Sequence, residues 1–568
     1  MAEQTKLPFG ERVKRAVGVE GDTKTVILPM IAYTITNMAT SGASYFNGLY
    51  YIAFLTYVEG LSGAQVGLIM LIKSIWDAVT DPMMGMISDR TRSKWGRHRV
   101  YIVFGALPYV FTFFMTWYSF GISAHGSSHA VMLYYIAAYI LYSTASTVIQ
   151  VPHTAMLPEL APDYFLRTQY NSIGYLMNSA GMVPSFLIAS AFLGLISTKD
   201  FSPALRGTFT ILGVILSLFY MIPIFITGFR CKERSSLADR VEKFDGGYVL
   251  REYKQVFKNK AFRQYFTISV LYMFALGFYN NAKVYFLREL ADVWSAYNII
   301  NIIAGVFEAS GFPLNFALTK KYGKQRCAWV TTPFLILSFL IMLFINGNVK
   351  VGGLSVTMIA VFIHTAFYSF GLSGMGFTTS NSYPDVTDVD ELITGRRREG
   401  VIATFSTFIK KVASGFMGMV VLTALEWFGV ATSSSTAMTG AIREGRHAYE
   451  LFGTLFGASF GIKLMGAVIP TLFILLALLA LKNYKMTKES HTMIRALIAT
   501  RHKYGRVDVT DAQKAACEQI AGRAWDEMWI STENAALSDG QPHYLSVGAD
   551  GKYLIPEKDE NGNYVVQA

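Results

Sequence analysis

Residues 68–87 read LIMLIKSIWDAVTDPMMGMI, an apolar stretch that carries two carboxylates. Asp77 and Asp81 lie four residues apart, and a helix turns by about 100° per residue, so both side chains project from nearly the same helix face. Inside a bilayer each of these charges costs roughly 2.5–3.5 kcal/mol on insertion scales. The pair therefore predicts a bound cation or proton that neutralises it.

The composition of the chain is that of a membrane protein. Of the 568 residues, 52% are hydrophobic and only 16% are charged, and the mean hydropathy is +0.34. Soluble domains contain about 25% charged residues. Apolar segments of roughly 20 residues recur along the chain. They predict twelve membrane spans, at 27–57, 64–88, 100–121, 130–157, 169–194, 208–229, 264–287, 295–319, 328–346, 354–380, 400–430 and 455–482.

The net charge of +11 is distributed unevenly, which argues against a nucleic-acid partner. The basic residues cluster on one side of the predicted membrane, and the loops on the opposite side carry few of them. The positive-inside rule then places both termini in the cytoplasm and the protein in the cell (inner) membrane. The Lys and Arg residues cluster on one side of the twelve-span arrangement, at 6–15, 90–99, 230–263, 320–326 and 396–398.

The spans divide into two groups of six, which predicts an all-α major facilitator fold with two related halves. A basic loop follows both the second and the eighth span, and Gly96 and Gly323 permit a tight turn in each. After the last span the composition becomes polar, with Thr510 as a helix N-cap. The predicted parts are the N-terminal half 1–229, the cytoplasmic loop 230–263, the C-terminal half 264–483 and a small cytoplasmic extension 484–568.

Three blocks of sequence carry a resemblance to a known family. They are WDAVTDPMMG with DRTRSKWGR at 76–97, LPELAPDY at 157–164, and DVTDVDELITGRRREG at 385–400. In these blocks the chain resembles the melibiose-permease-like glycoside–pentoside–hexuronide:cation symporters of the major facilitator superfamily. The resemblance covers roughly residues 25–485 and leaves the C-terminal extension outside it.

The resemblance implies a cation site and a link from it to the solute. In the family the paired carboxylates of the second helix bind the coupling Na⁺, Li⁺ or H⁺, a role that falls on Asp77 and Asp81. Thr80 stands where the family has Asn, and its hydroxyl can still ligate a hard cation. Thr147 matches a fourth-helix Thr of the site, and Lys411 matches the helix-eleven Lys that connects the cation and sugar sites.

The residues that hold sugar in the family are different here. By spacing, the first-helix Asp falls on Ser41, the fourth-helix Asp on Gln150 and the fifth-helix Arg near Tyr175. Two carboxylates that would accept hydrogen bonds from sugar hydroxyls are therefore missing. The resemblance implies the fold and the coupling, and it does not imply specificity for a galactoside.

Two further substrate candidates follow from polar residues inside predicted spans. His153 follows Pro152, which frees a backbone carbonyl, so the imidazole either contacts substrate or satisfies the interrupted helix. Asn281 lies in a cluster of amides, tyrosines and Lys283 that suits a polyhydroxyl or anionic ligand. The alternative for Asn281 is a hydrogen bond between helices.

Two lysines bear on the coupling. Lys73 lies one turn before Asp77, so a salt bridge between them is the structural alternative to ion binding there. One ammonium neutralises only one of two carboxylates, and a fixed internal cation favours H⁺ over Na⁺. Lys411 lies deep in its span, where a polar interior role competes with snorkelling to the membrane edge.

The sequence thus predicts a monomeric symporter that imports a sugar, glycoside, pentoside or uronate with Na⁺ or H⁺ by alternating access. Its expected partners are the small-molecule solute, a monovalent cation and membrane lipid; it needs no cofactor, and no enzyme motif is present. One alternative keeps the fold and carries a lysolipid or other amphiphile. Another is a ligand sensor or scaffold that signals through its tail.

Overall fold

The computed structural model describes residues 27–160, 164–193, 203–231, 254–352, 354–396, 398–430, 457–535, 537–538, 541–545 and 553. The described chain divides into two compact units. The first unit holds the described residues of Met1–Lys243, Asn281–Ile299 and Ser414–Gly461, and the second holds those of Phe244–Asn280, Ile300–Ala413 and Ile462–Ala568.

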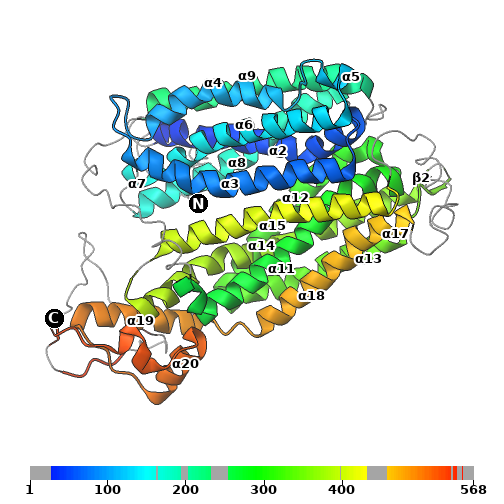
Figure 1. Ribbon diagram of the computed structural model, residues 1–568. Helices are drawn as coiled ribbons and strands as arrows, with labels where there is room; N and C mark the ends of the chain where they lie inside the picture. Colours follow the sequence, from blue (N-terminus) through cyan, green and yellow to red (C-terminus); the bar gives the residue numbers. More distant parts are fainter. Residues whose placement is uncertain are drawn as a thin grey trace, which may run out of the picture. The chain divides into compact units, whose positions relative to one another are not determined.

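Helices dominate the N-terminal part of the chain (Figure 1). Helix α3 begins with a capping box, in which Ser62 and Gln65 each accept a hydrogen bond from the other's backbone N–H. The elements of this part are α2 (Leu28–Ala53), η2 (Phe54–Val58), α3 (Gly63–Arg90), α4 (Arg99–Met115), α5 (Ile122–His125), α6 (Ser128–Ala155), α7 (Leu157–Leu160), α8 (Tyr164–Leu193), η3 (Pro203–Leu205) and α9 (Arg206–Arg230).

The C-terminal part is also mainly helical, with one short antiparallel pair of strands. Its elements are α11 (Lys260–Tyr285), η5 (Phe286–Leu290), η6 (Trp294–Ala296), α12 (Tyr297–Tyr322), α13 (Gln325–Phe344), β1 (Lys350–Val351), β2 (Leu354–Ser355), α14 (Val356–Thr394), α15 (Glu399–Trp427), α17 (Ala458–Lys463), η7 (Leu464–Val468), α18 (Ile469–Lys482), α19 (Lys488–Tyr504), α20 (Asp511–Ala521), η8 (Trp525–Glu527) and η9 (Trp529–Ser531).

Small residues bring helices into close contact within the first unit. A side chain at Gly181 of α8 would collide with the carbonyl oxygen of Met38 on α2, so only glycine allows this approach. Ser185 reinforces the same contact by donating a hydrogen bond of 2.7 Å to the carbonyl of Gly42. Close backbone approach and interhelical hydroxyl bonds are the usual devices of helix packing in membranes, where the hydrophobic effect is weak.

Each of the twelve predicted spans falls on a helix of the described chain. Seven helices are long and apolar enough to cross a membrane by length and composition. α4 and the Ala180–Leu193 part of α8 are apolar but shorter. The protein is therefore an integral membrane protein, while the count of twelve spans stays a prediction. The predicted tight turns have left-handed backbone at their glycines, with φ of 110° at Gly96 and 87° at Gly323.

Helix α14 extends well past the predicted span 354–380. Its 39 residues measure about 58 Å at 1.5 Å per residue, whereas the apolar core of a bilayer is about 30 Å thick. The extra length carries four buried carboxylates, which we call the α14 acid cluster: Asp385, Asp388, Asp390 and Glu391.

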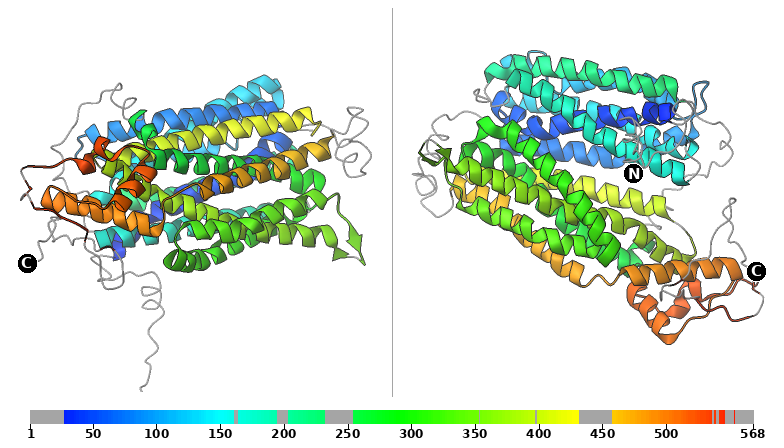
Figure 2. Two further views of the ribbon diagram at one scale, coloured as in Figure 1. Left: turned by 90° about the horizontal axis from the view of Figure 1, so that it is seen from below. Right: turned by 180° about the vertical axis from the view of Figure 1, so that it is seen from behind.

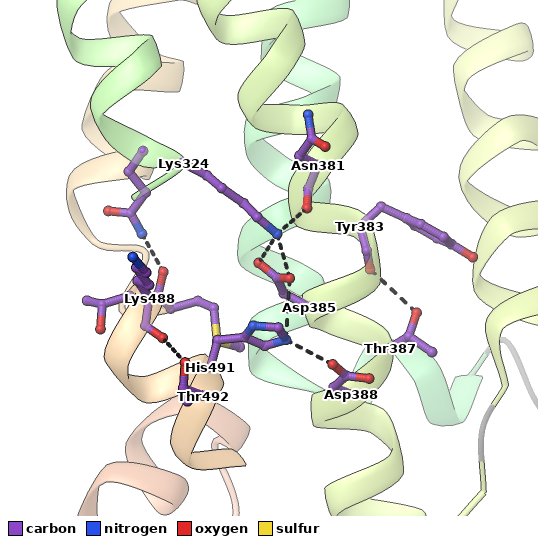
Figure 3. A network of polar contacts seen from close by, with 12 residues as sticks. Lys324, Asn381, Tyr383, Asp385, Thr387, Asp388, Lys488, His491 and Thr492 are labelled. Atoms are coloured by element: carbon purple, nitrogen blue, oxygen red, sulfur yellow. Dashed lines mark hydrogen bonds and ion pairs between the residues drawn. The ribbon is translucent and has the colours of Figure 1, made fainter. Parts of the chain in front are cut away.

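The start of α13 and the tail helix α19 contact the first part of the α14 acid cluster (Figure 3). The ammonium of Lys324 lies 2.7 and 2.9 Å from the two carboxylate oxygens of Asp385. His491 Nε2 lies 2.8 Å from Asp388 Oδ2 and 3.4 Å from Asp385 Oδ1. The tail thus contributes a side chain to the same carboxylates as α13.

The remaining two carboxylates of the cluster have their own partners. Arg398 holds Asp390 through two hydrogen bonds of 2.7 and 2.8 Å, and His502 Nε2 lies 3.0 Å from Glu391 Oε1. Any side chain at Gly395 would meet the Trp529 ring. The tail helices therefore pack against the end of α14, as Figure 2 also shows.

The helix start predicted in the tail is present. Thr510 caps α20 in a capping box with Gln513, as predicted. Asp508 forms an isolated bridge with Tyr544. Partial burial alone would raise the pKa of Asp508, but hydrogen bonds from Arg506 and from the backbone N–H of His543 hold this pKa below its ordinary value.

We expect the two tail histidines to stabilise α19 on α14. In His491→Ala/His502→Ala, two hydrogen bonds to carboxylates are lost, which lowers the opening free energy of α19 by about 2 kcal/mol. Hydrogen exchange of the α19 amides in the detergent-purified protein measures this change. Arg495→Gln, an exposed change on the same helix, is the control; α19 exchange that is equally slow in all three proteins would contradict the prediction.

Candidate functional site

Helix α3 presents the two predicted ion-binding carboxylates inside the first unit. Asp77 is buried and 6% exposed, and Asp81, one turn later, is half-buried. Asp81 directly precedes Pro82, and α3 continues through this proline to Arg90. The helical spacing expected from the sequence is therefore present, with both carboxylates on one side of α3.

Asp77 has an ammonium partner on its own helix. Lys73 Nζ lies 2.7 Å from Asp77 Oδ2, an i, i+4 ion pair whose side chains are 28% and 9% exposed. The same ammonium lies 5.6 Å from the centre of the Tyr139 ring on α6, within range of a cation–π attraction. The predicted alternative for Asp77, a salt bridge with Lys73, is thus present.

Asp81 receives its hydrogen bond from a different helix. Thr147 of α6 donates to Asp81 Oδ1 at 2.8 Å, so the structure brings this predicted co-ligand to the carboxylate. Thr80 donates its hydroxyl to the carbonyl of Trp76, one turn back in α3, at 2.9 Å. Only the lone pairs of the Thr80 oxygen are then available to a cation.

The formal charges of Lys73, Asp77 and Asp81 do not add up to zero. Two carboxylates and one ammonium leave one net negative charge on the triad of Lys73, Asp77 and Asp81. One monovalent cation or one proton would make the triad neutral. Among the described residues there is no group of three or more His, Cys, Asp or Glu that could hold a metal ion.

Sequence reasoning named Thr147 of α6 and missed Tyr139 and Ser143 on the same helix face. Tyr139, Ser143 and Thr147 follow one another at four-residue intervals, and all three are buried. Polar residues at positions i, i+4 and i+8 share one helix face. This spacing was the available signal, but it does not say which neighbouring helix the face meets.

Two of the predicted substrate residues hold helices together. Ser41 donates to the carbonyl of Asn178 on α8 at 2.9 Å. His153 is 3% exposed and stacks on Tyr33 with ring centres 4.2 Å apart. His153 Nε2 lies 2.9 Å from the Tyr33 carbonyl, and Tyr33 donates back to the His153 carbonyl. These reciprocal contacts between Tyr33 and His153 match the alternative in which His153 forms hydrogen bonds at the helix interrupted by Pro152.

The other predicted substrate residues have more varied surroundings. Gln150 is exposed and donates to Ser146 at 2.6 Å. A side chain at Gly418 would lie 3.5 Å from Asn281 Oδ1, so α15 passes close to this amide. Lys411 is half-buried on α15, and the side chain of Tyr175 lies outside the described residues.

Comparisons with known proteins identify the family of this chain. Residues 28–488 match the family described as MFS/sugar transport protein. The chain belongs to this family. The resemblance to glycoside–pentoside–hexuronide:cation symporters is confirmed, and the protein is a membrane transporter rather than an enzyme.

Individual relatives in this family are distant but aligned over most of their length. The inner membrane symporter YicJ of Escherichia coli is 23% identical over 375 residues, which are 66% of this chain and 76% of the relative. The isoprimeverose transporter of Lactiplantibacillus pentosus is 23% identical over 395 residues, covering 68% and 78%. The crystal structure of a D-xylose–proton symporter matches 79% of this chain and 97% of its own, with 12% identity and a TM-score of 0.53.

We expect Lys73→Met to destabilise the protein because Asp77 loses its ammonium partner. Removing one partner of a fully buried ion pair costs about 3–5 kcal/mol, and the partial exposure of Lys73 reduces the expected cost to about 1–3 kcal/mol. Thermal unfolding in detergent measures this cost. Lys73→Met/Asp77→Asn removes both charges and should recover most of the loss; a double variant that is no more stable than Lys73→Met would contradict the pairing.

Proposed function

We propose that this transporter is a cation-coupled symporter, which imports a sugar, glycoside, pentoside or uronate by alternating access. The observation that carries the proposal is the placement of two carboxylates one turn apart on one face of α3, next to polar side chains of α6. Lys73 pairs with Asp77 at 2.7 Å, and Asp81 accepts a hydrogen bond from a neutral hydroxyl of Thr147. A transported cation or proton would bind at these carboxylates.

Ion binding at Asp77 and Asp81 can be coupled to solute binding. A solute that favours the conformation in which the triad is neutral must bind more tightly when the ion is present, and the ion must in turn bind more tightly with the solute. Lys411 is the proposed link between the two sites. The proposed location is the cell (inner) membrane, with both termini in the cytoplasm and the protein acting as a monomer.

The nature of the ion depends on Lys73. A fixed ammonium beside Asp77 leaves Asp81 as the group that takes up the transported charge. Thr147 and the lone pairs of Thr80 then supply neutral oxygens next to Asp81. Na⁺ uses such oxygens as ligands, whereas a proton needs only the carboxylate.

We expect Asp81→Asn and Asp77→Asn to abolish accumulation driven by a Na⁺ or pH gradient, because the triad no longer binds the driving ion. Uptake of labelled solute into vesicles with each gradient measures this loss. Asp526→Asn, which removes an exposed carboxylate of the tail, should transport normally. Gradient-driven accumulation that persists in the Asp77→Asn/Asp81→Asn variant would rule out the proposed ion site.

We expect solute and ion to stabilise the purified protein together. A ligand at 100 times its Kd adds about 2.7 kcal/mol to stability, so a panel of sugars, glycosides and uronates with and without Na⁺, at several pH values, should contain members whose thermal shift depends on the ion. Lysolipids belong in the same panel. A shift with lysolipids alone would replace the sugar by an amphiphile as the cargo.

A further inference from the structure

A basic cavity lies in the second unit, where two candidate membrane spans end side by side. It has a volume of about 580 Å³ and is bounded by the turn between α12 and α13 and by the segment that joins α18 to α19. α13 begins at this turn, and α18 ends at Lys482. The two helices pack against each other (Figure 1), so the cavity lies at the membrane boundary of both.

The cavity carries more positive than negative charge. Arg326, Lys482 and Lys488 are exposed and line it, and the carboxylate of Glu489 lines it too. Lys324 also lines the cavity, but its ammonium is paired with Asp385 in the α14 acid cluster. With three basic side chains and one carboxylate, the lining is predominantly basic, which is complementary to a phosphate group.

Backbone polarity acts in the same direction. The cavity is lined by Thr487, Lys488 and Glu489, the N-cap and first turn of the 17-residue helix α19. The N-terminus of a helix carries a partial positive charge and unpaired N–H groups, both of which favour an anion. This contribution adds to that of the three side-chain cations.

An exposed apolar surface lies next to the cavity. Trp329 lines the cavity and is 40% exposed. From it an exposed apolar stripe continues along α13, through Val330, Phe334, Leu337 and Leu340. α18 carries a second exposed stripe, through Leu472, Leu475, Leu476 and Leu479. Both helices are candidate spans, so these stripes face acyl chains.

We infer that the cavity binds the headgroup of an anionic phospholipid, whose acyl chains lie along the exposed stripes of α13 and α18. Basic pockets at the ends of membrane helices are suited to such headgroups. The lipid phosphate would contact the start of α13 and the start of α19 together. A bound lipid therefore stabilises the tail helix in its position against the membrane unit.

The variant Arg326→Gln/Lys482→Gln/Lys488→Gln tests the site, because it removes three charges and keeps side chains of similar length. The matched control is Lys254→Gln/Lys258→Gln/Lys514→Gln, with the same loss of charge outside the cavity. Each full-length protein is purified in detergent and titrated with phosphatidylglycerol, with phosphatidylcholine and with inorganic phosphate. Thermal unfolding reports binding.

We expect phosphatidylglycerol to stabilise the unaltered protein and the control alike, and the cavity variant to bind it roughly a hundredfold more weakly, which corresponds to about 3 kcal/mol for three basic residues. Equal effects of phosphatidylcholine would overturn the inference, as would equal binding by the cavity variant. Stabilisation by inorganic phosphate at the same concentrations would show a soluble-anion site instead.

A second readout does not depend on the stability of the cavity variant. Phosphatidylglycerol with brominated acyl chains quenches nearby tryptophan fluorescence, and Trp329 borders both the cavity and the stripe. Quenching at low lipid-to-protein ratio should fall when Trp329 is replaced by Phe, and should exceed that by brominated phosphatidylcholine. The same quenching in Trp329→Phe as in the unaltered protein would place the lipid elsewhere.

Discussion

The structure depends on how a membrane helix tolerates charge. A carboxylate in the apolar interior of a bilayer is stable only when it is paired, hydrogen-bonded or protonated. α3 meets this requirement in part, through the 2.7 Å contact of Lys73 with Asp77 and the hydroxyl of Thr147 on Asp81. We propose that a transported ion binds beside these two carboxylates and completes their neutralisation. The same physical requirement thus explains both the packing of α6 on α3 and the proposed coupling.

Much of the fold could be predicted because the membrane imposes a length and a polarity on each helix. Every predicted span coincides with a helix, and the glycines of the two basic turns have the backbone expected of them. The end of α14 was placed at residue 380, and the helix continues to Thr394. The predicted span 354–380 was an apolar segment, whereas the helix continues through the clustered carboxylates that follow it.

The reason for that difference lies in partners that are distant in sequence. The α14 acid cluster is helical because Lys324, Arg398, His491 and His502 surround it. Two of these four belong to the tail, which has no counterpart in the resemblance to known transporters. A local pattern gives the charge of a helix end, and only the tertiary structure gives its counterions.

The candidate site shows the same division between local and tertiary information. The Lys73–Asp77 pair follows from i, i+4 spacing on one helix and could be predicted. The partners of Ser41 and His153 could not, because each bonds to a backbone carbonyl of another helix. A polar side chain inside a membrane protein is therefore a candidate for substrate binding only until its interhelical partner is known.

The two clusters of carboxylates, on α3 and on α14, consequently differ in the role that we assign to them. The pair on α3 lies within the predicted bilayer, with Lys73 on Asp77 and Thr147 on Asp81, and is the proposed ion site. The α14 acid cluster lies on the part of its helix that exceeds the bilayer thickness, and its four carboxylates face two fixed cations and two histidines. Water and the tail can compensate the remaining charge there, so neutrality requires no transported ion. Position relative to the membrane, rather than the residue type, therefore separates the proposed ion site on α3 from the surface on which the tail docks.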